Sequence, residues 1–221
     1  MFRHIRCKFI KDTEGVNKKY IIALLTLSAL VAAIPAFAQT RRGFEAAFNY
    51  TSLSMKQDLI TVDYVPGVKA GFMIETIFPG VGFGLNTGIY YSLRGAKLHL
   101  GEKTVWAADG YGNERAYLHY IEIPFHLRFK WTRMNGLEDY VAPFAYGGPT
   151  LGLMVAHNKS DALEYPFGEV GMTAGIGFEI CRRWQLAGSY TWGLTYALRT
   201  AKLDNFSGRN RQLSVGLTYF F

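Results

Sequence analysis

Residues 213–221, which read Leu-Ser-Val-Gly-Leu-Thr-Tyr-Phe-Phe, decide the fold of this chain. Every second residue of this stretch is apolar. The apolar positions are Leu213, Val215, Leu217, Tyr219 and Phe221, and the positions between them are mostly small or polar. A period of two residues is typical of a β-strand, because successive side chains of a strand point to opposite faces. We therefore expect the printed sequence to end on a strand whose apolar face carries the final aromatic residue.

Seven further segments alternate in the same way. They are residues 43–52, 67–77, 81–93, 117–131, 141–155, 169–180 and 184–195. In the fifth segment Phe144 and Tyr146 occupy even positions, whereas Leu151 and Leu153 occupy odd positions. A change of parity next to Gly147-Gly148-Pro149 predicts a β-bulge there. Together with the last segment, the pattern predicts eight strands.

The connections between these segments alternate between short and long. The short ones are residues 78–80, 132–140 and 181–183, and the long ones are residues 53–66, 94–116, 156–168 and 196–211. Antiparallel barrels that span the outer membrane have short periplasmic turns and longer outer loops. The alternation therefore predicts a barrel with both termini and the short turns in the periplasm and four loops outside.

A soluble eight-stranded barrel of the lipocalin kind would also alternate, with its apolar face turned inward. The faces opposite the apolar ones argue against it, because they are rich in small residues such as Gly82, Gly84, Gly175 and Gly177, which suit a crowded interior. The apolar faces end in aromatic residues, as membrane-interface girdles do. These aromatic residues are Tyr50, Tyr91, Trp131, Trp184, Trp192 and Tyr219. We predict an all-β fold, an eight-stranded antiparallel transmembrane β-barrel with its apolar face toward lipid.

The N-terminal 38 residues have the features of a secretory signal peptide. Lys18 and Lys19 precede an apolar run over residues 20–34, and Ala36-Phe37-Ala38 forms a small-x-small cleavage site. The apolar run is too short for a membrane-spanning helix. We expect cleavage after Ala38 and a mature barrel of residues 39–221. Residues 1–15 are unusual for such a peptide, so we expect the true start at Val16 and a mis-assigned start at Met1.

The overall charge of +7 is partly due to the predicted signal peptide. Residues 39–221 hold 18 basic and 15 acidic side chains, and they contain no long basic run, so no nucleic-acid partner is expected. Neither Cys7 nor Cys181 adjoins the cleavage site, which excludes a lipid anchor there. The mature chain would hold Cys181 alone, and we expect a buried, unreactive thiol.

By its motifs the chain resembles the PorT-like outer membrane protein β-barrel family of Gram-negative bacteria. The resemblance rests on the signal end 36–39, on Tyr120-Ile121-Glu122-Ile123-Pro124, on the run 147–152 and on Gly171-x-x-x-Gly175-x-Gly177. It implies a location in the cell outer membrane and a last strand, ending at Phe221, that the barrel-insertion machinery reads. Some family members take part in protein secretion, so a secretion-complex partner is one expectation.

Several charged residues have inward parity in the predicted barrel. They are Glu45, Lys69, Glu75, Glu122, Arg128, Lys130, Glu169 and Glu179. The interior of an eight-stranded barrel is just wide enough for side chains to fill, and buried charges must be paired. We therefore expect a network that plugs the lumen, with a narrow proton or ion path as the alternative. A general diffusion porin would need about 16 strands.

The strongest catalytic alternative is a lipid-modifying barrel enzyme, which needs a histidine close to a serine on one face. The sequence contains no His-x-Ser motif, and His119 has the parity of an interface residue. Glu122 and His126 lie about 13 Å apart along one strand, so a carboxylate on a neighbouring strand is the expected partner of His126. His99 and His157 fall in separate predicted loops. We predict no catalytic, cofactor-binding or metal site, and no cofactor.

The remaining place for function is the outer loops, above all residues 94–116 with Trp106, Tyr111 and the flexible stretch 109–113, which could form a contact surface. We expect a structural or interaction role, with contacts to outer-membrane lipid and lipopolysaccharide. An accessory role in protein secretion or solute transport is the second interpretation, and a lipid-modifying enzyme is the third.

Overall fold

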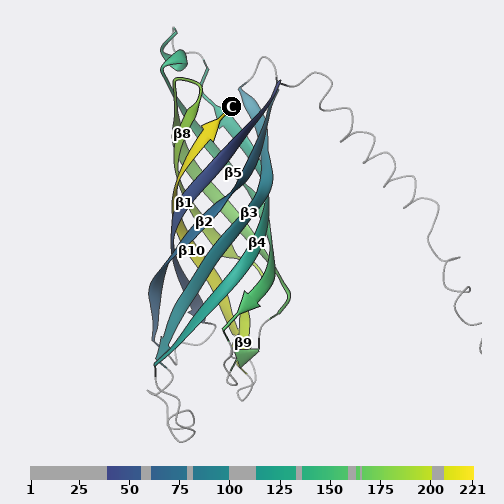
Figure 1. The fold of residues 1–221 in the computed structure, drawn as a ribbon, viewed down its shortest axis with the longest axis vertical. Helices are drawn as coiled ribbons and strands as arrows, with labels where there is room; N and C mark the ends of the chain where they lie inside the picture. Colours follow the sequence, from purple (N-terminus) through teal and green to yellow (C-terminus); the bar gives the residue numbers. More distant parts are fainter. Residues whose placement is uncertain are drawn as a thin grey trace, which may run out of the picture. The chain divides into compact units, whose positions relative to one another are not determined.

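Eight long antiparallel strands form the molecule, as the alternating sequence predicts (Figure 1). They are β1 (Gln39–Met55), β2 (Val62–Ile77), β3 (Phe83–His99), β4 (Asn113–Lys130), β5 (Val141–His157), β7 (Gly168–Ile180), β8 (Trp184–Gly193) and β10 (Ser207–Phe220). Two short strands, β6 (Leu163–Glu164) and β9 (Leu198–Thr200), and the 3-10 helix η3 (Leu137–Asp139) complete the set. This computed structural model describes residues 39–55, 61–78, 82–99, 113–132, 136–158, 163–164, 166–200 and 207–221. The predicted signal peptide and residues Trp106 and Tyr111 lie outside these ranges.

The sheet closes on itself. Each long strand pairs with its neighbour along the chain, and β10 pairs with both β8 and β1. Because Gly43 pairs with Phe220, the start of β1 lies beside the end of β10 (Figure 1). We call this end of the barrel, which also carries η3 and the 181–183 turn, the turn end. The opposite end, from which the other four connections leave, is the loop end.

The β7–β8 connection is a tight hairpin. Cys181 and Arg182 both have positive φ angles, 50° and 57°, and the Arg183 amide donates to the Ile180 carbonyl at 3.2 Å. Two consecutive residues with positive φ are typical of the type I′ turn, whose twist matches that of the strands it joins. Cys181 is exposed in this turn. The prediction that its thiol is buried was wrong, because turn geometry places this residue at the surface.

The outer surface of the barrel is an apolar belt. Phe48 is 72% exposed and Ile176 is 71% exposed, and the apolar residues of β10 also point outward. Aromatic residues border the belt at both ends: Tyr50 stacks on Tyr64 at the loop end, and Trp184 packs against Tyr219 at the turn end. The predicted orientation, with the apolar face outward, is confirmed. Within the described residues, no helix has the length and apolarity that a membrane crossing requires.

The pattern reverses at the loop end. Here the interior is apolar, and the largest fully buried side chains include Leu98, Leu118 and Leu198. The outward positions of the same region are polar, such as Lys97 between the inward-facing Ala96 and Leu98. Each long strand therefore has a polar inner face along the belt, and several change to an apolar inner face beyond it.

This reversal explains why the strands are longer than predicted. The strand predicted over residues 81–93 reaches His99, and the one predicted from residue 117 begins at Asn113. The predicted strands ended where the outward residues stop being apolar, which is at the edge of the belt. The hydrogen bonds between the strands continue beyond that point. His99 and His157 consequently lie at strand ends rather than in loops.

The bulge predicted at Gly147-Gly148-Pro149 is absent. The β5–β7 register runs without a shift from Val141 to Leu153, and Phe144 and Tyr146 face the lumen with the other even positions of β5. Both rings lie over glycines of β7: a Cβ on Gly175 would come within 2.5 Å of the Tyr146 ring, and one on Gly177 within 2.6 Å of the Phe144 ring. Phe144 and Tyr146 therefore face the lumen, and the prediction of a bulge, which placed them on the outer face, was wrong.

Candidate functional site in the barrel lumen

Oppositely charged side chains fill much of the lumen. Among the described residues, five cations and five carboxylates point inward and form ion pairs. The cations are Arg41, Lys69, Arg94, Arg128 and Lys130, and the carboxylates are Glu45, Glu75, Glu122, Glu169 and Glu179. All eight residues predicted to face inward belong to this network. Its formal charges balance, as a buried set of charges requires.

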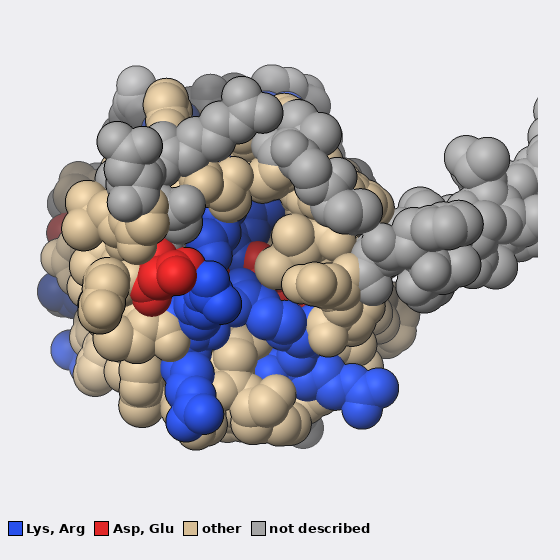
Figure 2. Space-filling model, turned by 90° about the horizontal axis from the view of Figure 1, so that it is seen from above, with Lys and Arg blue, Asp and Glu red and all other residues tan. Residues whose placement is uncertain are grey.

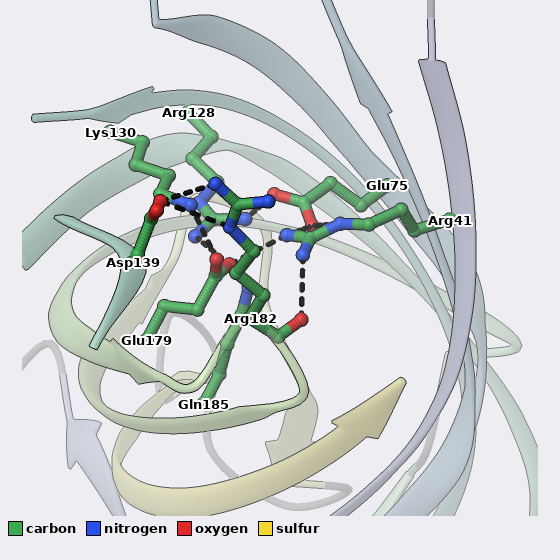
Figure 3. A network of polar contacts seen from close by, with 8 residues as sticks. All are labelled: Arg41, Glu75, Arg128, Lys130, Asp139, Glu179, Arg182 and Gln185. Carbon is green, nitrogen blue, oxygen red and sulfur yellow. Dashed lines mark hydrogen bonds and ion pairs between the residues drawn. The ribbon is translucent and has the colours of Figure 1, made fainter. Parts of the chain in front are cut away.

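The largest cluster lies at the turn end and is centred on Glu179 of β7 (Figure 3). Arg41 of β1 donates to Glu179 at 2.6 Å and to Glu75 at 2.5 Å. Arg128 contacts both carboxylates, and Lys130 pairs with Glu179. The Gln185 amide completes the shell of Glu179 at 2.9 Å. Side chains from three strands, β1, β4 and β8, thus converge on the two carboxylates of β2 and β7 at this end of the lumen.

Aromatic rings cover the arginines of the network. The Arg128 guanidinium lies 4.0 Å from the centre of the Phe144 ring, and Arg41 lies 4.5 Å from that of Phe220. A guanidinium over an aromatic face gains cation–π attraction that grows when water is excluded. The inward aromatic residues therefore help to hold the charged groups in place, in addition to filling volume.

A second cluster lies in the lumen nearer the loop end. Arg94 of β3 donates to Glu122 at 2.7 and 2.9 Å and to Glu169 at 3.0 Å. Asn210 of β10 donates to the other oxygen of Glu169. Arg94 is 3% exposed and both carboxylates are equally buried, so this triad is shielded from water.

Between the two clusters lies a polar section with a small cavity of about 40 Å³. Lys69 pairs with Glu45 at 2.9 Å on one side of it. On the other side His126 Nε2 lies 2.9 Å from the Thr150 hydroxyl, which continues through Thr173 to Thr191 at 2.9 and 2.8 Å. A polar cavity of this size has room for a few water molecules and for no larger solute.

Two members of the network, Arg41 and Arg94, were missed by the sequence analysis. Both lie outside the predicted strands, Arg41 before the first strand and Arg94 after the third. Both continue the inward parity of their strands, Arg41 with Gly43 and Glu45, and Arg94 with Tyr90 and Ser92. A prediction that extended each strand as long as its polar inward positions continued, and not only as long as its apolar outward positions did, would have included both arginines.

The histidines do not come together. His126 has a threonine hydroxyl, not the predicted cross-strand carboxylate, as its hydrogen-bond partner. His119 Nδ1 lies 2.5 Å from the Tyr91 hydroxyl on the outer face, as expected of an interface residue. His99 pairs with Asp63 at 2.9 Å beyond the belt. No group of three or more His, Cys, Asp or Glu side chains suited to a metal ion occurs in the part of the chain that the structure describes.

The surface of the turn end is strongly basic, and lysine and arginine side chains gather around the mouth of the lumen (Figure 2). Arg182 pairs with Asp139 of η3 at the rim, and Arg41 also donates to the Arg182 carbonyl at 2.9 Å. Arg42 and Arg183 are exposed nearby. The rim therefore carries more cations than carboxylates among its described side chains, in contrast to the balanced lumen.

Comparison with known proteins gives a family match. A family model described as the outer membrane protein beta-barrel domain matches residues 37–199. Among the 38 solved chains that match, OprG from Pseudomonas aeruginosa is 10% identical, with a TM-score of 0.48 over 82% of this chain and 94% of that one. Neisserial surface protein A is 12% identical, with a TM-score of 0.45 over 81% and 97%. The outer membrane enzyme PagL is 8% identical, with a TM-score of 0.37 over 77% and 97%. No curated protein matches the sequence.

Proposed function

Because the chain belongs to the outer membrane protein β-barrel domain family, we propose that it is a closed outer-membrane barrel with a structural or interaction role. The observation that carries this proposal is the balanced ion-pair network across the lumen. Two clusters, one around Glu179 and one around Arg94, lie on either side of a cavity of about 40 Å³. A solute would have to break several buried ion pairs to pass.

Planar-bilayer recording tests the closed lumen. The purified protein is expected to show no large, steady conductance, and vesicles that contain it should not admit sugars. A 16-stranded porin reconstituted in the same way is the positive control. Reproducible open pores that admit sugar-sized solutes would contradict the proposal and favour a channel.

The second candidate function is an accessory role in protein secretion or solute transport, which the PorT-like motifs suggest. The basic rim of the turn end favours this candidate, because an exposed charged surface on the periplasmic side suits a protein partner (Figure 2). Co-purification from detergent-solubilised outer membranes is the test. A stoichiometric partner that is lost in the variant Arg42→Ser/Arg182→Ser/Arg183→Ser would support the accessory role. A barrel that purifies alone would count against it.

We infer that the barrel is not a lipid-modifying enzyme. Among the side chains that the structure describes, the one histidine–hydroxyl pair in the lumen is His126 with Thr150, and it adjoins a cavity too small for an acyl chain. Mass spectrometry of lipopolysaccharide and phospholipid incubated with the protein should show unchanged acyl chains. Acyl loss that disappears in His119→Ala or His126→Ala would overturn this inference.

A further inference from the structure

A pair of arginines lies on the lipid-facing side of β10 at the loop end. Arg209 and Arg211 are exposed and alternate with the inward residues Gly208, Asn210 and Gln212. Residues two apart on one face of a strand are about 6.7 Å apart, so the two guanidinium groups can reach a common anion. Neither arginine has a carboxylate partner among the described residues.

The neighbouring strand adds one partly exposed hydroxyl group to this surface. Ser54 of β1 pairs with Arg209, and cross-strand partners have their Cβ atoms about 5 Å apart, whereas Ser52, the partner of Arg211, is buried. Arg209 lies 5.1 Å above the Tyr196 ring, which restricts its direction. Two guanidinium forks next to a hydroxyl donor match the geometry of phosphate oxygens.

The position of the pair along the barrel indicates where this phosphate comes from. Arg211 is ten residues from Phe221, which corresponds to about 26 Å along the barrel axis for a strand tilted by about 40°. The apolar belt of outer-membrane barrels is about 25 Å tall. Arg211, opposite the exposed Trp192, therefore lies at the outer edge of the hydrocarbon, and Arg209 lies at the level of the lipid headgroups.

Cations outnumber carboxylates among the outward described side chains elsewhere at the loop end. Lys97 of β3 and Arg115 of β4 are direct cross-strand partners, a like-charge pair that is unfavourable unless an anion lies nearby. Asp63 contacts Lys97 at 3.5 Å and is the only acidic side chain facing outward here among the described residues. The outer edge of the belt is thus basic on two sides of the barrel.

From these observations we propose that Arg209, Arg211 and Ser54 form a binding site for the phosphate of an outer-leaflet glycolipid. This outer-leaflet phosphate site would fix a lipid of the lipid A class beside the β10–β1 seam. Its premises are the outer-membrane location and a loop end that faces outward. It does not depend on the closed lumen, so a conducting barrel would leave it intact.

The test measures binding of diphosphoryl lipid A to the full barrel in detergent. We expect the native protein to bind it at least about tenfold more tightly than lipid A without phosphates, because charge-assisted bidentate contacts are lost with the phosphate. Arg209→Ser/Arg211→Ser should weaken binding by a similar factor, and Arg209→Lys/Arg211→Lys should restore part of it. Heat-modifiable mobility confirms that each variant is folded.

The matched control is Arg182→Ser/Arg183→Ser, which removes the same charge from the turn end. It should leave lipid A affinity within about twofold, since distant exposed charges interact weakly. Equal weakening in both double variants, or equal affinity for lipid A without phosphates, would overturn the proposal. Displacement of lipid A by an equal concentration of inorganic phosphate would assign the site to free phosphate and overturn the lipid as its ligand.

Discussion

At the scale of single residues, Glu179 organises the turn end of the lumen. Its two oxygens accept from Arg41, Lys130 and Gln185, with Arg128 close by, so three strands besides its own, β1, β4 and β8, contact one carboxylate. Removing one partner of a buried pair leaves the other charges uncompensated.

The variant Glu179→Gln keeps the shape of the side chain and removes the charge. It should lower the free energy of unfolding by about 3–5 kcal/mol, as expected for breaking a buried ion pair. Urea-unfolding curves in lipid vesicles measure the effect. The control Asp139→Asn breaks the exposed pair with Arg182 and should cost less than about 1 kcal/mol. Similar losses in the two variants would show that the Glu179 cluster is not shielded.

The exposed Asp63 offers a pH prediction at the loop end. The hydrogen bond from His99 holds the pKa of the Asp63 carboxyl below its ordinary value of 3.8, with a smaller contribution from the charge of Lys97. A carboxyl group whose pKa is lower in the folded than in the unfolded protein stabilises the fold. This stabilisation is complete above the pKa of the unfolded state and is lost as the pH falls through the pKa of the folded state. Carboxyl NMR should therefore find Asp63 titrating below 3.8, and His99→Ala should raise its midpoint. An unchanged midpoint in that variant would contradict the assigned cause.

At the scale of elements, the sequence predicted the eight long strands and the outward face of each. The apolar alternation suffices for this, because lipid selects one face along the whole belt. The apolar alternation gave wrong predictions where side-chain packing inside the barrel, and not lipid, determines which residues are apolar. At the loop end the interior becomes apolar, and in β5 the rings of Phe144 and Tyr146 fill space left by glycines of β7. The ion-pair partners depend on register across strands, which no single strand's pattern reveals. Arg41 and Arg94 were missed for a different reason, because each predicted strand stopped where its apolar alternation ended.

The last strand gives the prediction for this scale. Leu217 of β10 faces outward and is 47% exposed near the middle of the belt. The variant Leu217→Lys should make folding into the membrane less favourable by about 2–4 kcal/mol and impair insertion into the outer membrane. The control Arg211→Lys keeps a cation on the same face at the edge of the belt. Deleting Phe221 should also impair insertion if the insertion machinery reads this strand. Normal amounts of heat-modifiable Leu217→Lys protein would contradict the lipid-facing assignment.

At the scale of the whole molecule, one barrel has two kinds of interior. Leu118 and Leu127 both belong to β4, but Leu118 is 1% exposed inside the loop end and Leu127 is 55% exposed on the belt. Leu118 packs with Tyr120 and Met154 in an apolar core like that of a soluble protein.

Leu118→Ala should therefore destabilise the barrel by about 2–5 kcal/mol, because it leaves a cavity in a packed core. Leu127→Ala should cost less, since lipid chains can fill the space that it vacates. Unfolding in vesicles of constant lipid composition compares the two. If Leu127→Ala proved the more damaging variant, the loop-end core would not be a packed interior.

The balanced lumen has an electrical consequence for the molecule as a whole. At the turn end Arg41, Arg128 and Lys130 face Glu75 and Glu179, an excess of one positive charge, while near the loop end Arg94 faces Glu122 and Glu169, an excess of one negative charge. The pair Glu45 and Lys69 between them is neutral. The interior is thus a permanent electric dipole along the barrel axis, with its positive pole at the turn end. Because the charges of the interior sum to zero, a Donnan potential across the outer membrane exerts no net force on them. The same potential acts on their dipole, and it therefore favours one orientation of the barrel in the membrane over the reverse.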